Sequence, residues 1–102
     1  MSVAPNQTGS YLVEYYWPGV TDEALAQTVA RADAAASELR RHGRRVDLRG
    51  TILVRSDEIV FCLFDGSEAD VRAAGELAGV PFERVLESLW LDARGKRSEV
   101  DR

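Results

Sequence analysis

Two glutamates interrupt stretches of the sequence that are otherwise apolar. Glu14 lies within "YLVEYYW" (residues 11–17) and Glu87 within "RVLESLW" (residues 84–90). A carboxylate among apolar side chains is costly unless a counter-charge, a ligand or water compensates it. An ion pair is the simpler interpretation, and a ligand-binding site is the alternative. Three arginines could supply the counter-charge: Arg49, Arg55 and Arg84.

If these two segments form neighbouring strands of one sheet, Glu14 and Glu87 are expected to share a face. Alternation along a strand puts Tyr16 on the same side as Glu14, so the predicted ligand site consists of Glu14, Tyr16 and Glu87. Such a site could also be catalytic. Glu14 would then be the general base, and Tyr15 or Tyr16 would be the hydrogen-bond donor that orients a substrate.

The chain has one histidine and one cysteine, residue types that transition metals such as nickel favour. His42 lies in "RRHGRR" (residues 40–45), at the expected end of a helix, where a cationic side chain complements the helix dipole. Cys62 lies within an apolar run, where cysteine is commonly a buried residue whose surroundings raise the thiol pKa and leave it inert. The candidate metal ligands are Glu14, His42 and Cys62, although a structural role is the simpler interpretation of the last two.

Charge and hydropathy exclude several classes of protein. The net charge is -4 at pH 7, and nucleic acid binds basic surfaces, so the arginines of residues 40–45 are interpreted as a solvated face. No apolar run approaches the roughly 18 to 20 residues that span a bilayer. The first residues, "MSVAPNQTGS", lack the basic and apolar regions of a signal peptide. We therefore expect a cytoplasmic protein with no membrane or nucleic-acid partner.

The spacing of apolar residues predicts the elements that must position these groups. Residues 10–17 are rich in aromatic and β-branched residues and predict a strand, which the turn residues of "PGVT" end. Thr21 can cap a long helix whose apolar residues recur at helical spacing up to Gly43. Residues 44–64 hold two apolar runs divided by "RSDE", which predicts a hairpin. Gly50 within the first of these runs suggests a bulge or a close backbone approach.

A second, shorter helix and a last strand complete the pattern. Ser67 followed by Asp70 resembles a capping box, and Gly79 and Pro81 end this helix. The segment "FERVLESLWL" (residues 82–91) predicts the final strand. The order β-α-β-β-α-β is that of the ferredoxin-like fold, an α+β fold in which two helices cover one face of a four-stranded antiparallel sheet.

The predicted domain covers residues 10–91, between a flexible N-terminal tail (1–9) and a charged C-terminal tail (92–102). Its sheet has a single helical layer, so one face is left without cover. Alternation divides the first strand into two sides: Tyr11, Val13, Tyr15 and Trp17 against Leu12, Glu14 and Tyr16. Neither side is polar enough to face water. A second copy of the chain, packed sheet to sheet, would supply the cover and form a dimeric α/β barrel.

The segments "YLVEYYWPGVT", "FCLF" and "VRAAGELAGVPFERVLE" form a further pattern together with the predicted order of elements. This pattern resembles a small bacterial domain family, largely of unknown function, that includes a nickel-binding protein with a dimeric ferredoxin-like fold. The resemblance spans roughly residues 10–91 and implies a homodimer that binds nickel. The family pattern has a Ser-Tyr pair in the second strand and a histidine in the second helix, whereas this chain has Arg49, Gly50 and Thr51 in the former place and Ala74 in the latter.

Two classes of function follow from these observations. The first is a non-enzymatic, small dimeric binding protein, whose ligand the resemblance makes nickel or another divalent transition metal. The second is a cofactor-independent monooxygenase, isomerase or cyclase, because dimeric ferredoxin-like barrels also resemble enzymes that hold a small molecule in the dimer lumen. A third possibility is a partner domain whose sheet face meets a different protein.

Overall fold

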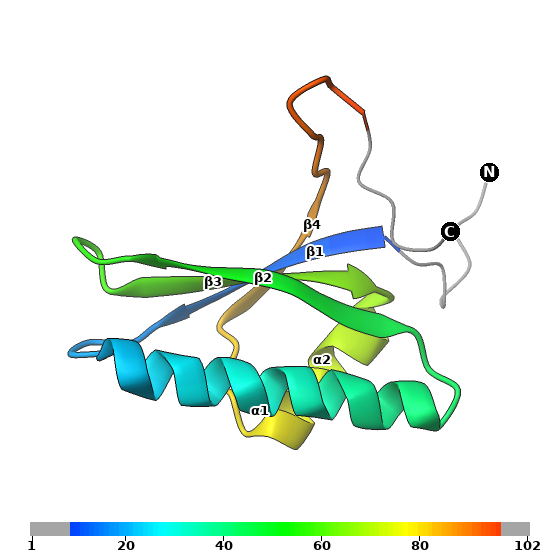
Figure 1. The fold of residues 1–102 in the computed structure, drawn as a ribbon, viewed down its shortest axis with the longest axis horizontal. Coiled ribbons are helices and arrows are strands. Elements are labelled where there is room, and N and C mark those ends of the chain that lie inside the picture. Colours follow the sequence, from blue (N-terminus) through cyan, green and yellow to red (C-terminus); the bar gives the residue numbers. More distant parts are fainter. Residues whose placement is uncertain (1–8, 97–102) are drawn as a thin grey trace.

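The computed structural model describes residues 9–96, which form one four-stranded antiparallel sheet with two helices on one of its faces (Figure 1). In chain order the elements are β1 (Gly9–Tyr16), α1 (Asp22–Arg41), β2 (Val46–Val54), β3 (Ile59–Gly66), α2 (Glu68–Ala78) and β4 (Arg84–Ser88). The order of strands across the sheet is β2-β3-β1-β4. The predicted α+β fold with the ferredoxin-like order βαββαβ is confirmed. The predicted tails lie mostly outside the described residues.

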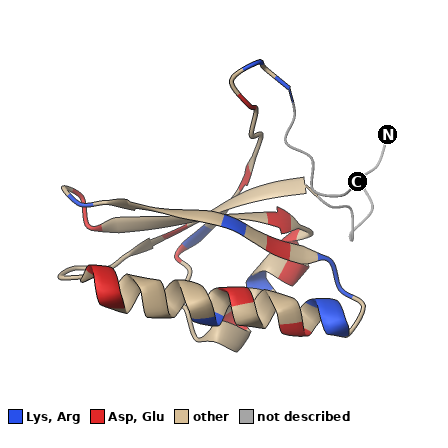
Figure 2. Ribbon diagram, in the orientation of Figure 1, with Lys and Arg blue, Asp and Glu red and all other residues tan. Residues whose placement is uncertain are grey.

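Both helices begin at the predicted caps. Thr21 Oγ1 accepts a hydrogen bond from the backbone N–H of Ala24, and Ser67 Oγ accepts one from the backbone N–H of Asp70, each at 3.1 Å. These bonds satisfy donors that the first turn of a helix leaves unpaired. α1 has acidic residues in its first turn and arginines in its last turn, as its dipole favours (Figure 2). α2 ends at Gly79, whose φ of 74° is a left-handed conformation that suits glycine.

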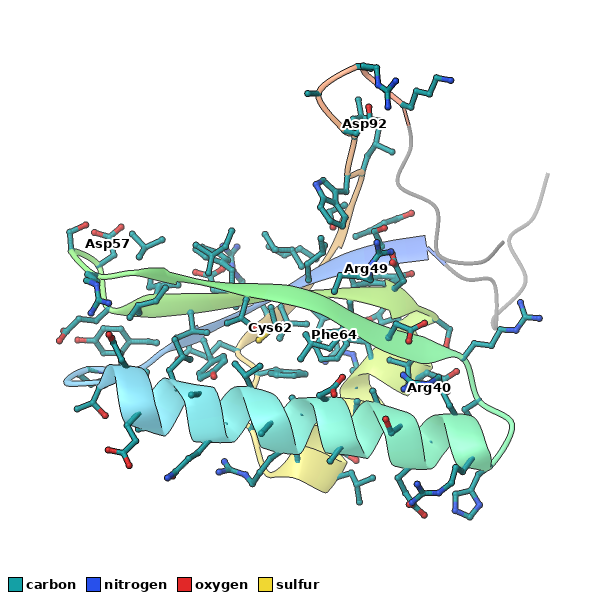
Figure 3. The ribbon with its side chains drawn as sticks, viewed as in Figure 1. Arg40, Arg49, Asp57, Cys62, Phe64 and Asp92 are labelled. Atoms are coloured by element: carbon teal, nitrogen blue, oxygen red, sulfur yellow. The ribbon has the colours of Figure 1, made fainter. Side chains whose placement is uncertain are left out.

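The hydrophobic core lies between the sheet and the two helices. Val13, Val60 and Phe64 of the sheet and Val71 of α2 have no exposed surface, and Figure 3 shows Phe64 in the layer between the sheet and α1. The helices bury mainly small residues: Ala32, Ala35, Ala36, Ala74, Gly75 and Ala78. Small side chains let the helices approach the sheet and each other closely, so the larger side chains of the strands fill this layer.

Two irregularities shape the sheet. The β2–β3 register shifts between Leu48 and Gly50, so Arg49 is an extra residue on β2. This bulge confirms one of the two interpretations of Gly50. β4 is shorter than the predicted strand of residues 82–91 and ends at Ser88. Ser88 pairs with Ser10, which lies near the start of β1, so β1 offers few further residues for pairing. The chain after β4 leaves the sheet on the side away from the helices (Figure 1).

The turn between β2 and β3 also holds the end of β1. Glu58 in this turn has a φ of 56°, which is uncommon for a residue with a Cβ atom. Its carbonyl oxygen accepts a hydrogen bond from the backbone N–H of Trp17 at 2.7 Å, and its Oε2 accepts one from the backbone N–H of Gly19 at 2.9 Å. These two bonds fix the backbone where β1 leads into α1.

We predict that Gly66→Ala lowers the free energy of unfolding by about 2 kcal/mol or more, measured by urea denaturation. Gly66 has a φ of 150°, and a Cβ atom there would lie 2.6 Å from the carbonyl oxygen of Arg45. Because that oxygen belongs to the backbone, no side-chain rotation can relieve the clash.

Gly50→Ala is the matched control, because a Cβ atom at Gly50 would meet no described atom within 4 Å. Its free energy of unfolding should stay within about 1 kcal/mol of the wild-type value. Equal losses of stability in the Gly66 and Gly50 variants would contradict the steric argument.

Candidate functional site

The face of the sheet turned away from the helices, called the open face below, is largely apolar. Val13 and Tyr15 are buried under the helices, so alternation turns the residues beside them to the opposite face. Ile52 and Tyr16 on the open face are 62% and 53% exposed. From the strand registers, the open face carries Leu12, Glu14, Tyr16, Ile52, Val54, Ile59, Phe61, Leu63, Arg84 and Leu86.

Glu14 forms an ion pair with the neighbouring strand. Arg84 lies directly opposite Glu14 on β4, and its NH2 and Nε atoms lie 2.7 and 2.9 Å from Glu14 Oε1. Of the three arginines considered as counter-charges, Arg84 is therefore the partner. The Glu14 side chain is 15% exposed, whereas that of Arg84 is 63% exposed. A guanidinium with this much solvent contact can rehydrate, which would leave the carboxylate open to a ligand.

A second polar group lies at the end of the open face nearest the bulge. Asp65 is 5% exposed and accepts hydrogen bonds from Ser10 Oγ at 2.7 Å and from Arg49 NH1 at 2.5 Å. The Arg49 guanidinium also lies 5.3 Å from the ring centroid of Trp90, a cation–π distance. Sequence reasoning missed this group. The polar residues Ser10 and Asp65, each at one end of an apolar strand, were the available signal.

The segment of residues 89–96, called the arm below, projects from the open-face side of the sheet, and Figure 3 labels Asp92 near its tip. Its apolar side chains Leu89, Trp90 and Leu91 are 61%, 40% and 45% exposed. A turn orders the tip, since Asp92 Oδ1 accepts hydrogen bonds from the backbone N–H groups of residues 94 and 96, both at 2.9 Å. The arm therefore adds exposed apolar surface to the open-face side.

The prediction that Glu87 lies beside Glu14 is wrong. Glu87 lies opposite Tyr11, whereas Glu14 lies opposite Arg84, three residues earlier on β4. An odd separation along a strand turns two side chains to opposite faces, so Glu87 is on the helix side. Consistent with this, burial raises the pKa of Tyr11, and the charges of Glu87 and then Glu68 raise it further.

Of the two tyrosines considered as substrate-orienting donors, Tyr16 shares a face with Glu14 and Tyr15 does not. Tyr15 is 3% exposed under the helices. A ligand on the open face would therefore meet an apolar floor, with Glu14 and Arg84 on its β4 side, Tyr16 beyond them along β1, and Arg49 on the opposite edge strand β2. This arrangement can bind a molecule that has an apolar body and polar ends.

Cys62 is buried on the helix side of the sheet, as predicted, and is 3% exposed. Figure 3 places it between the sheet and α1. Burial raises the pKa of the Cys62 thiol, and the hydrogen bond that Thr51 Oγ1 donates to Sγ at 3.7 Å offsets only part of this rise. The thiol is therefore held in its neutral, weakly reactive form.

The candidate metal ligands lie in three separate places. His42 is at the C-terminal end of α1, with its Nε2 atom 2.9 Å from Glu38 Oε2. Cys62 is in the core, and Glu14 is on the open face. In residues 9–96, no three His, Cys, Asp or Glu side chains are grouped closely enough to hold a metal ion. The donor groups of one described chain do not fit a metal site of three or four ligands.

Three of the four arginines in residues 40–45 lie in separate ion pairs. Arg40 pairs with Asp47 at 2.8 Å, Arg44 with Asp70 at 2.7 Å, and Arg41 with Glu38. The first two pairs tie this region to β2 and α2, and the third lies within α1. Neither helix in residues 9–96 is long and apolar enough to cross a membrane.

Comparison with known proteins supports the fold. No family model and no curated protein matches the chain. The crystal structure of SCO4226 from Streptomyces coelicolor A3(2) is similar, with a TM-score of 0.68 and 18% sequence identity over 78% of this chain and 95% of that chain. At this identity the likeness concerns the fold alone. The chain is an α+β protein with the ferredoxin-like order of elements.

A double-mutant cycle of Glu14→Gln and Arg84→Gln should give a coupling free energy of no more than about 1 kcal/mol in urea denaturation, because Arg84 is mostly exposed. The control is the exposed pair Glu68–Arg72 on α2, substituted in the same way, whose coupling should be about 0.3–0.5 kcal/mol. A coupling of several kcal/mol between Glu14 and Arg84 would show that the pair is structural and unavailable to a ligand.

At pH 8, native protein should react with the thiol reagent DTNB at least about 100-fold more slowly than urea-unfolded protein, because Cys62 is buried and its pKa is raised. The native rate should increase as the pH rises, since the thiolate fraction grows. Native labelling at the unfolded rate would contradict the burial of Cys62.

Proposed function

We propose that the protein is a homodimer that binds a small ligand in a lumen between two sheets packed open face to open face. One observation carries this proposal. The open face is apolar, yet Ile52 and Tyr16 on it are more than half exposed. Exposed apolar patches of this kind mark interaction surfaces. Burying two such faces against each other would remove both from water, which is the main driving force of association.

A second copy of the chain fits this face because of the arm. The arm leaves β4 on the open-face side (Figure 1). Leu89 and Leu91 on it are 61% and 45% exposed, and Trp90 is 40% exposed although its ring lies 5.3 Å from the Arg49 guanidinium of its own sheet. In a face-to-face dimer, each arm would reach alongside the partner subunit and bury these side chains there. The arm and the open face thus supply two surfaces that one symmetric interface would cover together.

The ligand proposed for the lumen is a small organic molecule with an apolar body and polar ends. Ligand sites are mostly apolar with a few well-placed polar groups, and each open face offers this combination. Gly50 lies opposite Leu63 and adds no side chain there, which leaves space above the floor. Glu14 with Arg84, and Arg49 with Asp65, are the polar groups that would orient the ligand.

Nickel is the ligand that the family resemblance implies, and it requires its own test. Since the donors of one described chain do not fit a metal site, a bound metal would need donors from both subunits, with Glu14 as the candidate on the open face. Elemental analysis of protein purified without a histidine tag, followed by nickel titration of the wild type and Glu14→Gln, tests this. Metal bound by the wild type and lost in the variant would favour nickel over an organic ligand.

The alternative is a cofactor-independent monooxygenase, isomerase or cyclase. The observation that favours it is that Glu14 and Tyr16 lie on the same open face, where one could accept a proton and the other orient a substrate. The ion pair with Arg84 opposes it, because the guanidinium already engages the carboxylate that must accept the proton. Chemical conversion of a bound small molecule would distinguish this enzyme from a binding protein.

In sedimentation velocity at micromolar concentration, the wild type should have about twice the chain mass of 11.3 kDa. Ile52→Asp should give a monomer, because dimerisation would bury a carboxylate without a partner. Leu77→Asp is the control, since Leu77 is 56% exposed on α2, away from the open face, and this variant should stay dimeric. A monomeric wild type would contradict the proposal.

A further inference from the structure

The carboxylate of Glu14 on the open face has one oxygen engaged by the protein and one without a donor. Both contacts from Arg84 reach Oε1, with NH2 at 2.7 Å and Nε at 2.9 Å. Within residues 9–96, Oε2 accepts no hydrogen bond. The buried side-chain polar atom that lacks a partner in these residues is the Tyr15 hydroxyl. Glu14 Oε2 therefore keeps contact with solvent, and the side chain as a whole is 15% exposed.

The backbone fixes this acceptor in place. Arg84 lies directly opposite Glu14, and the backbone N–H of Glu83 donates a hydrogen bond to the carbonyl oxygen of Glu14 at 2.9 Å. This bond holds the start of β4 against β1, so the guanidinium stays on the β4 side of the carboxylate. A molecule on the open face could then reach Oε2 without displacing Arg84.

Asp65, at the end of the open face nearest the bulge, does not offer an acceptor of this kind. Its Oδ1 accepts a hydrogen bond from Ser10 Oγ at 2.7 Å, and its Oδ2 accepts one from Arg49 NH1 at 2.5 Å. Its side chain is 7% exposed. Both oxygens of Asp65 thus have a donor from the protein, whereas Glu14 has a donor on only one.

The surroundings of Glu14 on the open face are apolar and partly aromatic. Phe61 lies directly opposite Glu14 on β3, and the Cβ atoms of residues paired in this way are about 5 Å apart. Leu12 and Tyr16 are the neighbours of Glu14 along β1 on the same face. A group bonded to Oε2 would lie beside the Phe61 ring. Aromatic rings attract each other in offset or edge-to-face arrangements, so this place favours a ligand with an aromatic ring.

Covering the open face would make a donor to Oε2 necessary. A carboxylate oxygen removed from water without a hydrogen bond costs free energy, and in the proposed dimer the second sheet would exclude bulk water. Arg84 already supplies the counter-charge, and a second cation beside the guanidinium would be repelled by it. A neutral hydroxyl supplies the hydrogen bond without added charge, and a hydroxyl bonded to a carboxylate forms a short, strong bond.

We propose that the lumen binds a phenol whose hydroxyl donates a hydrogen bond to Glu14 Oε2 and whose ring packs against Phe61. This assignment rests on the proposed function, because only a dimer would enclose the open face. It narrows the ligand from a molecule with an apolar body and polar ends to an aromatic ring that carries a neutral hydroxyl. It also makes Glu14 the residue that selects this ligand.

NMR titration with p-cresol and 4-methylanisole tests the proposal. The two probes have the same ring and methyl group, but the ether cannot donate a hydrogen bond. p-Cresol is the side chain of tyrosine, whose ordinary pKa is about 10, so it is neutral at pH 7. It should bind the wild-type dimer at least about tenfold more tightly than 4-methylanisole. Benzylamine, a cation of similar size, should bind more weakly than p-cresol.

Glu14→Gln should bring the affinities for p-cresol and 4-methylanisole to within about threefold of each other. The amide oxygen can still accept the Arg84 hydrogen bonds, and the amide nitrogen, which is a donor, would replace Oε2. If the ether were excluded only by its size, the preference for p-cresol would survive this change. Glu68→Gln is the matched control, because Glu68 is an exposed glutamate on α2 that pairs with Arg72. It should keep the wild-type preference.

Sedimentation velocity on the same samples separates failure of the dimer from failure of the phenol site. A monomeric wild type would overturn both. With a dimeric wild type, four results would overturn the phenol site alone: no p-cresol binding at about 10 mM, equal affinity for p-cresol and its ether, tighter binding of benzylamine, or a preference for p-cresol that persists in Glu14→Gln. The first three need only the wild type, so they decide the question even if the Glu14 variant does not fold.

Discussion

Two helices cannot cover both faces of a four-stranded sheet, and here both lie on the same side (Figure 1). On that side, small residues of α1 and α2 bring the helices close to the strands, and the larger side chains of the sheet are buried. The other side carries Leu12, Phe61 and Leu63 without a helical layer. Because burial of apolar surface is the dominant favourable term in folding and association, the uncovered side favours any partner that removes it from water.

The polar groups on the two sides of the sheet also differ in whether they have a partner. On the open face, Glu14 has its counter-charge directly across the strands, and Asp65 receives one from Arg49. The β-bulge makes the second pair possible, because the extra residue re-aims a side chain on the edge strand. On the helix side, Tyr15 has a buried hydroxyl that the described chain leaves without a partner. The two ion pairs and the unpartnered Tyr15 hydroxyl all lie on the central strands β1 and β3 or on the strands next to them.

Local chemistry made most of the fold predictable, whereas contacts between distant segments could not be predicted. The caps at Thr21 and Ser67 and the bulge near Gly50 depend on neighbouring residues, so sequence patterns sufficed. The relation between Glu14 and Glu87 depends on strand register, which the turn before β4 sets, and a shift by an odd number of residues reverses the face.

The pairing of β1 with β4 has a consequence for the newly synthesised chain. Glu14 and Arg84 are 70 residues apart in sequence, yet their strands are adjacent in the centre and at the edge of the sheet. While the ribosome has not yet released β4, β1 offers an unpaired edge that is rich in aromatic residues. Such edges recruit strands from other chains, and a large loop must close before the correct strand can arrive. Nascent chains that stall before residue 84 are thus exposed to aggregation, and release of β4 ends that exposure.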